Sequence, residues 1–387
     1  MNVGPLVPAD ETFNHQITET FATVSQSDRS WTEKVCAQAA ARDGSVQVHL
    51  GLGKYPNRGV LDAYAGVSRG VEQWTVRSSR PLAMDREATA VGPIRYEVLE
   101  PLQSVRFALD ANDIVPVSFE WTFERVVPPA LENREVHRAP DGGRIDADIV
   151  RYHQTGVAHG WVEVDGERTE IAPTTWFSTR DHSWGVRYMV GAPVADTLTR
   201  GEVPGLSSLI LWSPMLCETE AGDPYALHVF LQQHTMGGHL VRVEAQGGVE
   251  HPDGRRERFV AVRPDLAFDP VNRRLRGGTL HATLADGTER PLTITALGET
   301  GFHLGAGLYF GFDDEWHGQY HGPGLHLAGE HEPDCTGLEA AHRLHQLRDT
   351  VVAVEDPTVG GHGWGNAQPM VTGAHPTLGL DEASSFV

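Results

Sequence analysis

Five consecutive residues, Asp181-His182-Ser183-Trp184-Gly185, bring an acid, an imidazole and an indole within four positions of one another. A carboxyl group donates a proton near neutral pH where burial raises its pKa. An aromatic ring stabilises a neighbouring cation through its π-face. These residue types therefore point to general acid chemistry through a cationic intermediate, and no other string in the chain is as specific.

The backbone decides which of these side chains can act together. Neighbouring residues of a strand face opposite sides, so Asp181 and Ser183 would share one face while His182 and Trp184 share the other. Either the motif lies at a bulge or a strand end, or only one of the two pairs lines a cavity. A purely structural role is the alternative, in which Asp181 caps backbone amides in a turn and Trp184 fills the core.

The surrounding segment, residues 176–187, resembles the Asp-His-x-Trp-Gly signature of the carotenoid 1,2-hydratase (hydroxyneurosporene synthase) and AttH-like group. Residues 91–96 and 209–213 give looser support. The resemblance implies two lipocalin-like β-barrels in tandem with a ligand cavity. It also implies hydration of an isoprenoid carbon–carbon double bond without a redox or metal cofactor. Related tandem-lipocalin proteins are implied to catalyse pericyclic closures as well, so the fold does not fix the reaction.

Under this resemblance, we expect a cofactor-independent hydratase or dehydratase that acts on an apolar, isoprenoid small molecule. Asp181 is the expected general acid, with an apolar barrel lumen to raise its pKa, and His182 is its partner or the residue that orients water. A non-catalytic lipid or isoprenoid carrier is the alternative from another class. Aromatic or cationic residues near the motif or in a predicted strand are the first substrate-binding candidates: Trp184, Arg180, Trp176 and Trp121.

A second polar block, residues 51–59, lies between two predicted strands. Its Tyr55, Asn57 and Arg58 could form the polar rim of a cavity, and we include them among the substrate-binding candidates. The glycines and Pro56 equally predict a structured loop, in which Asn57 and Arg58 would hydrogen bond to backbone carbonyls. The two interpretations differ in whether the side chains reach a ligand.

Four histidines close in sequence, His317, His321, His326 and His331, raise the alternative of a metal-assisted hydrolase. Two histidines four positions apart bind one ion on a helix, but the glycines and the proline between these residues oppose a helix. On a strand, four residues span about 13 Å, which is too far for one ion. We therefore predict no metal and no other cofactor.

The fold that must position these residues is predicted to be all β. Alternation alone does not distinguish a sandwich from a barrel, and the resemblance favours barrels. Residues 32–42, which include an alanine run, are interpreted as the first arm of a hairpin. The hairpin signals are Asp43-Gly44, Asp141-Gly142, Asp165-Gly166, Asp253-Gly254 and Asp286-Gly287. Period-two alternation predicts strands at residues 73–77, 95–99, 104–109, 117–123 and 227–233.

Domain organisation is predicted from length and from the turn-rich segments. A chain of 387 residues exceeds what one core usually serves, so two domains are expected. We place the boundary near Ala172, which gives an N-terminal barrel of residues 1–172 and a C-terminal barrel of residues 173–387. Residues 131–148 are predicted to form a long loop, residues 152–171 a hairpin, and residues 376–387 a loose tail.

Composition narrows the classes of partner. The formal net charge of −21 disfavours nucleic acid and anionic membrane surfaces. The three cysteines are far apart, which opposes a disulfide framework or a zinc site and fits a reducing cytoplasm. No stretch approaches the roughly 20 apolar residues of a membrane span, and the N-terminus lacks a signal-peptide pattern. We expect a cytoplasmic protein without integral membrane association, whose partner is an apolar small molecule; a homo-oligomer is compatible with the sequence.

Overall fold

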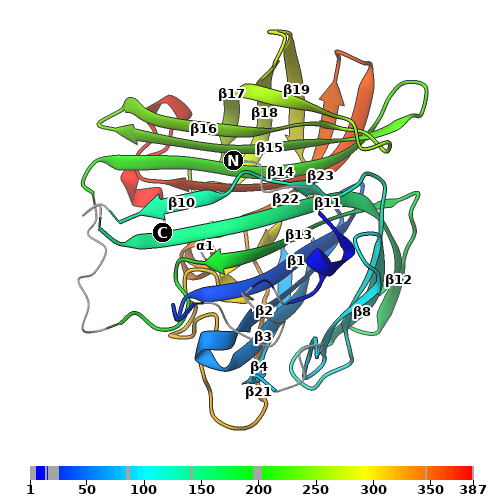
Figure 1. Cartoon of the computed structure of the whole chain (residues 1–387), viewed down its shortest axis with the longest axis vertical. Helices are drawn as coiled ribbons and strands as arrows, with labels where there is room; N and C mark the ends of the chain where they lie inside the picture. The colour runs from blue at the N-terminus through cyan, green and yellow to red at the C-terminus, as the bar shows by residue number, and fades with distance from the viewer. Residues whose placement is uncertain are drawn as a thin grey trace.

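The protein consists of two curled antiparallel sheets, stacked one above the other along the long axis of the molecule (Figure 1). The computed structural model describes residues 6–13, 15, 26–83, 88–139, 143–194, 203–344 and 347–385. The fold is all β, with two lipocalin-like barrels in tandem, as predicted. We call the barrel formed by the 14-stranded sheet the N-terminal barrel and that formed by the 9-stranded sheet the C-terminal barrel.

The N-terminal barrel contains the strands of the first half of the chain and one strand from much later in it. Its sheet curls until β5 and β6 contact β3 and β4. Its strands are β1 (Trp31–Ala41), β2 (Val46–Tyr55), β3 (Val60–Arg69), β4 (Glu72–Pro81), β5 (Ala90–Val91), β6 (Ile94–Glu100), β7 (Ser104–Leu109), β8 (Val117–Arg125), β9 (Ala130–Leu131), β10 (Glu135–Arg138), β11 (Ile145–Val164), β12 (Glu167–Ile171), β13 (Trp176–Val186) and β21 (His326–Glu332).

The C-terminal barrel is closed by hydrogen bonds between β19 and β22. Its strands are β14 (Leu206–Glu218), β15 (Pro224–Met236), β16 (His239–Glu250), β17 (Arg256–Phe268), β18 (Leu275–Leu284), β19 (Glu289–Ala296), β20 (Phe302–His303), β22 (Arg348–Asp356) and β23 (Gly361–Thr372). The first strand after the predicted boundary at Ala172, β13, pairs with β1 and β11 of the N-terminal barrel. The division at this residue remains a prediction.

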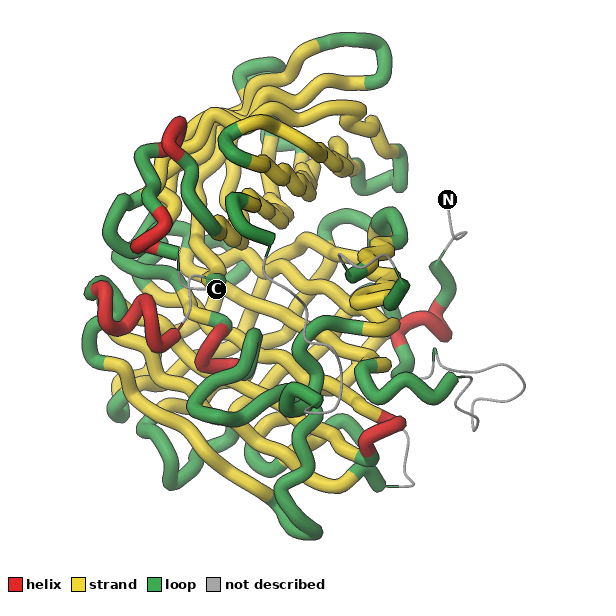
Figure 2. The backbone as a smooth tube through the Cα atoms, turned by 90° about the vertical axis from the view of Figure 1, so that its left-hand side faces the viewer, coloured by secondary structure: helices red, strands yellow, loops and turns green. Residues whose placement is uncertain are grey.

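Short helices lie at the margins of the strands (Figure 2). None of those in the described part of the chain has the length and apolar character that crossing a membrane requires. They are the α-helix α1 (Leu338–Leu344) and the 3₁₀ turns η1 (Pro8–Glu11), η2 (Pro56–Arg58), η3 (Gly305–Gly307), η4 (Pro376–Leu378) and η5 (Glu382–Ser384).

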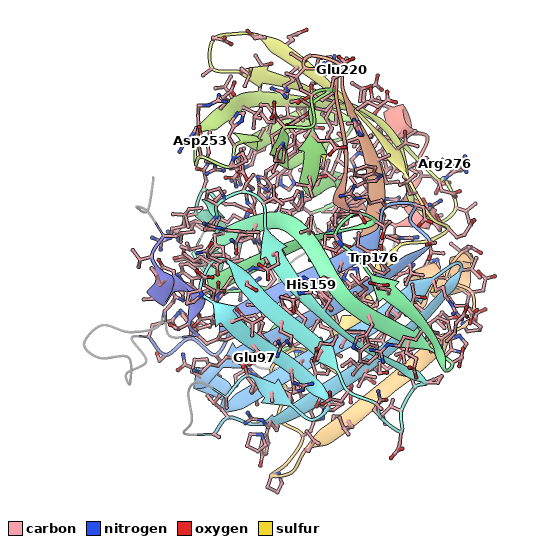
Figure 3. All side chains as sticks on the ribbon, turned by 90° about the vertical axis from the view of Figure 1, so that its right-hand side faces the viewer. Glu97, His159, Trp176, Glu220, Asp253 and Arg276 are labelled. Atoms are coloured by element: carbon pink, nitrogen blue, oxygen red, sulfur yellow. The ribbon has the colours of Figure 1, made fainter. Side chains whose placement is uncertain are left out.

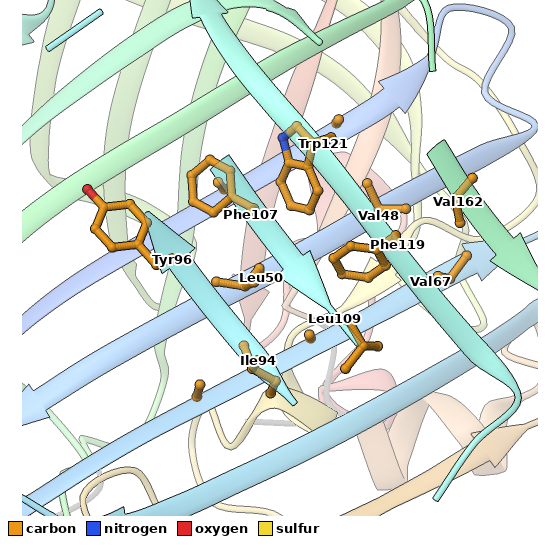
Figure 4. Packing of buried hydrophobic residues seen from close by; sticks show 14 of the residues in the cluster. Val48, Leu50, Val67, Ile94, Tyr96, Phe107, Leu109, Phe119, Trp121 and Val162 are labelled. Atoms are coloured by element: carbon orange, nitrogen blue, oxygen red, sulfur yellow. The ribbon is translucent and has the colours of Figure 1, made fainter. Parts of the chain in front are cut away.

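Both barrels have interiors filled by apolar side chains. Figure 4 shows the N-terminal core, where Tyr96, Phe107 and Trp121 on one wall pack toward Val48 and Leu50 on the other. A second, separate core fills the C-terminal barrel with residues of β14, β15 and the strands around them. Alternation explains both cores, because every second residue of a strand points inward.

The predicted strands and hairpins are largely confirmed. All five period-two segments lie in strands, and residues 32–42 begin the hairpin of β1 and β2. Residues 152–171 belong to the hairpin of β11 and β12, whose turn residues Asp165 and Gly166 have φ values of 51° and 80°. Positive φ at both central positions is the hairpin turn that Asp-Gly favours. The pairs at residues 43, 253 and 286 also join strands, whereas Asp141-Gly142 lies outside the described residues.

Two predictions about irregular segments are wrong. Residues 131–148 contain the end of β9, all of β10 and the start of β11. Their polar composition resembles a loop because Glu135 and His137 of β10 face a cavity instead of a core. The described part of the C-terminal segment, residues 376–385, is not loose: Arg273 donates a hydrogen bond to Ser384 Oγ, 3.0 Å away. Leu380 is buried in the C-terminal core.

Candidate active site between the two barrels

A cavity of about 620 Å³ lies between the two barrels. On the N-terminal side it is lined from β1, β10, β11 and β13, and on the C-terminal side from β14, β15, β22 and β23. Along β14, Ser208, Ile210 and Trp212 face the cavity while Leu209 and Leu211 face the C-terminal core. A cavity of this size suits a small organic ligand. The cavity thus lies at the junction between the barrels and not in the expected barrel lumen.

Asp181 faces this cavity from β13. Its carboxyl group accepts a hydrogen bond from Ser183 Oγ at 3.1 Å and lies 3.5 Å from the guanidinium of Arg151. Burial raises the pKa of Asp181, and the nearby Arg151 and Arg187 only partly oppose this shift. A carboxyl group in this setting keeps its proton to higher pH than an exposed one, as a general acid requires.

Arg151 is shared among several carboxylates and so neutralises Asp181 incompletely. Its guanidinium lies 3.3 Å from Glu132 and 3.1 Å from Glu135, both closer than Asp181. Glu132 in turn accepts a hydrogen bond from Trp212 Nε1 at 2.9 Å, which links the two barrels. Arg151 therefore holds the wall of the cavity together as well as facing Asp181.

A second buried carboxyl group, Asp349 of β22, lines the same cavity. Asn366 and Gln368 donate hydrogen bonds to its Oδ1 at 2.9 and 2.8 Å, and no arginine or lysine of the described residues lies within 4.0 Å of it. Burial raises the pKa of Asp349 to about 7 despite these two hydrogen bonds. Asp181 and Asp349 are thus two carboxyl groups of one cavity in different environments, which is how acid and base roles are separated in many enzymes.

Lys34 of β1 brings an ammonium group to the cavity. Its Nζ lies 2.8 Å from His317 Nε2 and 3.9 Å from the centre of the Tyr309 ring. Burial lowers the pKa of Lys34 to about 8, and burial together with Lys34 lowers the pKa of His317 to about 4. His317 is therefore neutral at physiological pH and accepts the hydrogen bond from Lys34. Tyr55, one of the predicted substrate-binding residues, lines this part of the cavity.

His182 and its neighbours on alternate positions of β13 face away from the cavity. His182 Nε2 lies 3.0 Å from Glu33 Oε1 and its Nδ1 lies 3.1 Å from Tyr152 Oη, so both ring nitrogens are engaged inside the N-terminal barrel. In this structure His182 is not the partner of Asp181. The physical reason is the regular register of β13, which alternates the two side chains across the sheet.

Arg180 and Trp184 share that inner face and bind the N-terminal segment. Arg180 donates two hydrogen bonds to the Glu11 carboxylate at 2.8 and 2.7 Å, and both side chains are buried. Trp184 stacks on His15, with ring centroids 3.5 Å apart. The signature thus has two roles, because one face lines the cavity and the other contacts Glu11 and His15 of the N-terminal segment.

The remaining predicted substrate-binding residues do not line the cavity either. Trp121 and Trp176 belong to the N-terminal core, and Figure 3 places Trp176 near the level where the barrels meet. Asn57 Nδ2 donates to the backbone oxygens of Gln26 and Asp28, at 2.8 Å each. Arg58 Nε donates to the backbone oxygen of Gly318 at 2.7 Å. The structured-loop interpretation of these last two residues is therefore confirmed.

A family model spans almost the whole chain, over residues 6–380, and describes a family of unknown function, DUF8625. The chain belongs to this family. None of the curated proteins compared with this DUF8625 chain matches it.

Solved structures relate the fold of this family member to known ones. A protein of Nitrosomonas europaea that carries the provisional name AttH has a TM-score of 0.50 at 12% identity, over 87% of this chain and 92% of that one. CghA in complex with Sch210972 gives 0.46 at 12% identity over 92% of each chain. Kievitone hydratase from Nectria haematococca gives 0.41 at 11% identity over 87% of this chain and 88% of that one. Only the first score supports a shared fold, and at this identity it supports the fold alone.

The DUF8625 chain contains three clusters, among its described residues, with donors that could hold a metal ion: His15, Glu33 and His182; Glu132, His153 and His228; and Glu315, His321 and His326. In the last two, the imidazoles stack in parallel with centroids 3.7 and 4.0 Å apart. Stacked rings hold their in-plane lone pairs side by side, so these lone pairs do not converge on one ion.

The first cluster is better described as a hydrogen-bonded network, because His15 and His182 both contact the same oxygen of Glu33. Of the four histidines considered from the sequence, His321 and His326 lie together, whereas His317 contacts Lys34 and His331 stacks on Trp74. A metal-assisted hydrolase is therefore disfavoured by geometry, and elemental analysis of the purified protein would test it.

Several cavity residues of this family member escaped sequence reasoning, chiefly Lys34, Arg151, Asp349 and Tyr309. They come from separate strands and from the loop before β21, and no local spacing connects them. One signal was available: Lys34 is one of only two lysines in the chain.

Proposed function

We propose that the cavity between the barrels is the active site of a cofactor-independent lyase, which adds water to or removes water from a carbon–carbon double bond of a largely apolar, isoprenoid-type molecule. The observation that carries this proposal is the Asp181 carboxyl group, which faces the cavity and has its pKa raised by burial. The Asp-His-x-Trp-Gly resemblance and the shared fold with the AttH-named protein agree with it.

In the hydration direction, the Asp181 carboxyl group gives its proton to one carbon of the double bond, and the adjacent carbon becomes cationic. The aromatic rings of Tyr309, Trp212 and Phe230 line the cavity and can stabilise this cation. One water then adds to the cation, and the proton that the water loses restores the carboxyl group. Dehydration is the same sequence in reverse.

The direct test incubates the protein with an isoprenoid and small-lipid extract in ¹⁸O-labelled water and follows products by mass spectrometry. The expected product is an intact alkene that has gained one labelled water. Asp181→Asn should reduce the rate by at least about 100-fold, because a positioned acid contributes that much. Asp148→Asn is the matched control, since Asp148 lies on β11 with its carboxylate bound to the exposed Arg134 at 2.6 Å.

Asp349→Asn tests the rival acid in the same assay. Loss of turnover in Asp349→Asn with normal turnover in Asp181→Asn would transfer the acid role to Asp349. If wild type turns over nothing but releases a bound apolar molecule on denaturation, the carrier function is correct and Asp181 is structural.

A further inference from the structure

Two cations that line the cavity, the buried Lys34 and the half-buried Arg187, have no carboxylate partner within 4.0 Å among the described residues. Lys34 has only 3% of its surface exposed, and its contacts are the neutral His317 and the face of the Tyr309 ring. No carboxylate oxygen of the described residues lies within 4.0 Å of its ammonium group. Asp62 is separated from it by the His317 ring, whose Nδ1 lies 3.8 Å from Asp62 Oδ2.

Arg187, directly after β13, is the second cation. Its guanidinium contacts the Ser183 hydroxyl, and its Nε is buried without a hydrogen-bond partner. Within the described residues, no carboxylate oxygen lies within 4.0 Å of it, in contrast to Arg151, which has three. Ser183 is the register partner of Lys34 across β1 and β13, so the two cations approach the same part of the cavity wall.

Unpaired buried cations are costly, because their hydration is lost and no counter-charge replaces it. Asp181 lies on the same wall as both cations and accepts a hydrogen bond from the Ser183 hydroxyl that Arg187 contacts, but the proposed reaction requires its carboxyl group to be protonated when substrate binds. The missing negative charge must then come from outside the protein. The C-terminal barrel contributes apolar side chains to the opposite wall, among them Ile210, Phe230 and Met370, beside polar ones such as Gln232 and Asn366.

We propose that the ligand of this cavity is an amphipathic molecule with a carboxylate head group, which Lys34 and Arg187 bind, and an apolar body, which lies against the C-terminal barrel. This inference rests on the proposed use of the cavity as the ligand site and narrows its substrate class. A neutral hydrocarbon would leave both cations unpaired, whereas a carboxylate satisfies them with two charge-assisted interactions.

The test compares decanoate with decanol, which share an apolar chain and differ in head-group charge. Isothermal titration of the full-length protein at pH 7 should give at least tenfold tighter binding for decanoate. Arg187→Gln and Lys34→Gln should each lose most of that preference while decanol affinity stays unchanged, which also shows that the variant cavity is intact. Arg168→Gln is the matched control, because Arg168 stacks on Trp161 at the outer surface.

Equal affinities for the two probes, or a preference that survives in both Lys34→Gln and Arg187→Gln, would overturn the inference. The measurement involves no turnover, so it can fail while the lyase proposal stands. Asp181→Asn further separates the head-group proposal from the lyase proposal: this variant should lose turnover and keep the preference for decanoate. A loss of the preference in Asp181→Asn would mean that Asp181 organises the head-group site, and would contradict the assignment to the two cations.

Discussion

The charged side chains on the two faces of β13 differ in whether they have a partner of opposite charge. On the inner face, Arg180 pairs with Glu11 through two hydrogen bonds, and His182 pairs with Glu33. On the cavity face, Asp181 shares one arginine with other carboxylates, and the neighbouring Lys34 has no carboxylate partner among the described residues. Paired charges stabilise the folded chain, whereas unpaired charges cost stability and are retained where a ligand or a reaction needs them. Substitutions on the two faces should therefore have opposite effects.

The largest effect is expected from Arg180→Met. This change leaves the Glu11 carboxylate buried without its cation, although Tyr96 and Tyr152 still donate hydrogen bonds to it at 2.9 Å. Breaking a buried pair costs about 3–5 kcal/mol, so the free energy of unfolding in urea should fall by that amount. Decanoate affinity per folded molecule should be unchanged. A loss below about 1 kcal/mol would show that the inner face does not anchor the N-terminal segment.

Asp349→Asn should instead raise the free energy of unfolding relative to wild type, and this gain should appear only as the pH rises above the acidic range. The folded pKa of Asp349 is about 7 against 3.8 for an exposed carboxyl group, so between these values the folded protein holds a proton that the unfolded chain has lost. Stability from this group is therefore complete below pH 4 and decreases as pH rises toward 7, at up to about 1.4 kcal/mol per pH unit. Asp349→Asn lacks this decrease, so its stability relative to wild type should rise by roughly 3 kcal/mol across that range.

Urea unfolding at several pH values measures this difference directly. Asp110→Asn is the control, because Asp110 is exposed and paired with Arg95 at the surface. A constant difference between Asp349→Asn and wild type from pH 4 to pH 7.5 would show that Asp349 ionises as an ordinary carboxyl group.

A smaller loss is expected from His182→Gln, which removes one of the two hydrogen bonds to Glu33 and Tyr152. The cost should be about 1–3 kcal/mol, because a buried acceptor is left unsatisfied. Although burial alone would lower it, the pKa of His182 is raised by Glu11 and Glu33. Its contribution is therefore complete below pH 6.5 and is lost as pH rises through the raised pKa. Turnover should fall far less than in Asp181→Asn, and an equal fall would return His182 to the catalytic machinery.

Local pattern was sufficient to predict many of the strands and turns and the alternation of the signature. The period-two argument correctly separated Asp181 and Ser183 from His182 and Trp184, because side-chain direction along a strand depends only on position. The same argument could not tell which face meets the cavity. That choice depends on how two barrels dock, and the docking surfaces come from strands far apart in sequence.

Aromatic side chains were the least reliable guide to the site. Trp121 and Trp176 fill the N-terminal core, and Trp184 holds His15, so none of the three touches the cavity. Trp212, which does line it, has the same kind of alternating context as the others. The residue type and the local sequence pattern are therefore the same at core and cavity positions. Only the tertiary pairing of strands distinguishes a core position from a cavity position.

One strand has consequences for how the chain is made. β21 hydrogen bonds to β4 along its whole length, although about 250 positions separate them: His326 is opposite Ser79 and Glu332 is opposite Gln73. A ribosome synthesises residues 72–81 long before residues 326–332, so the edge of β4 waits without its partner while most of the C-terminal barrel is being translated. Exposed strand edges recruit other chains. Newly made protein should therefore depend on chaperones during this interval, and a shortened gene that ends before residue 326 should yield aggregates instead of a free N-terminal barrel.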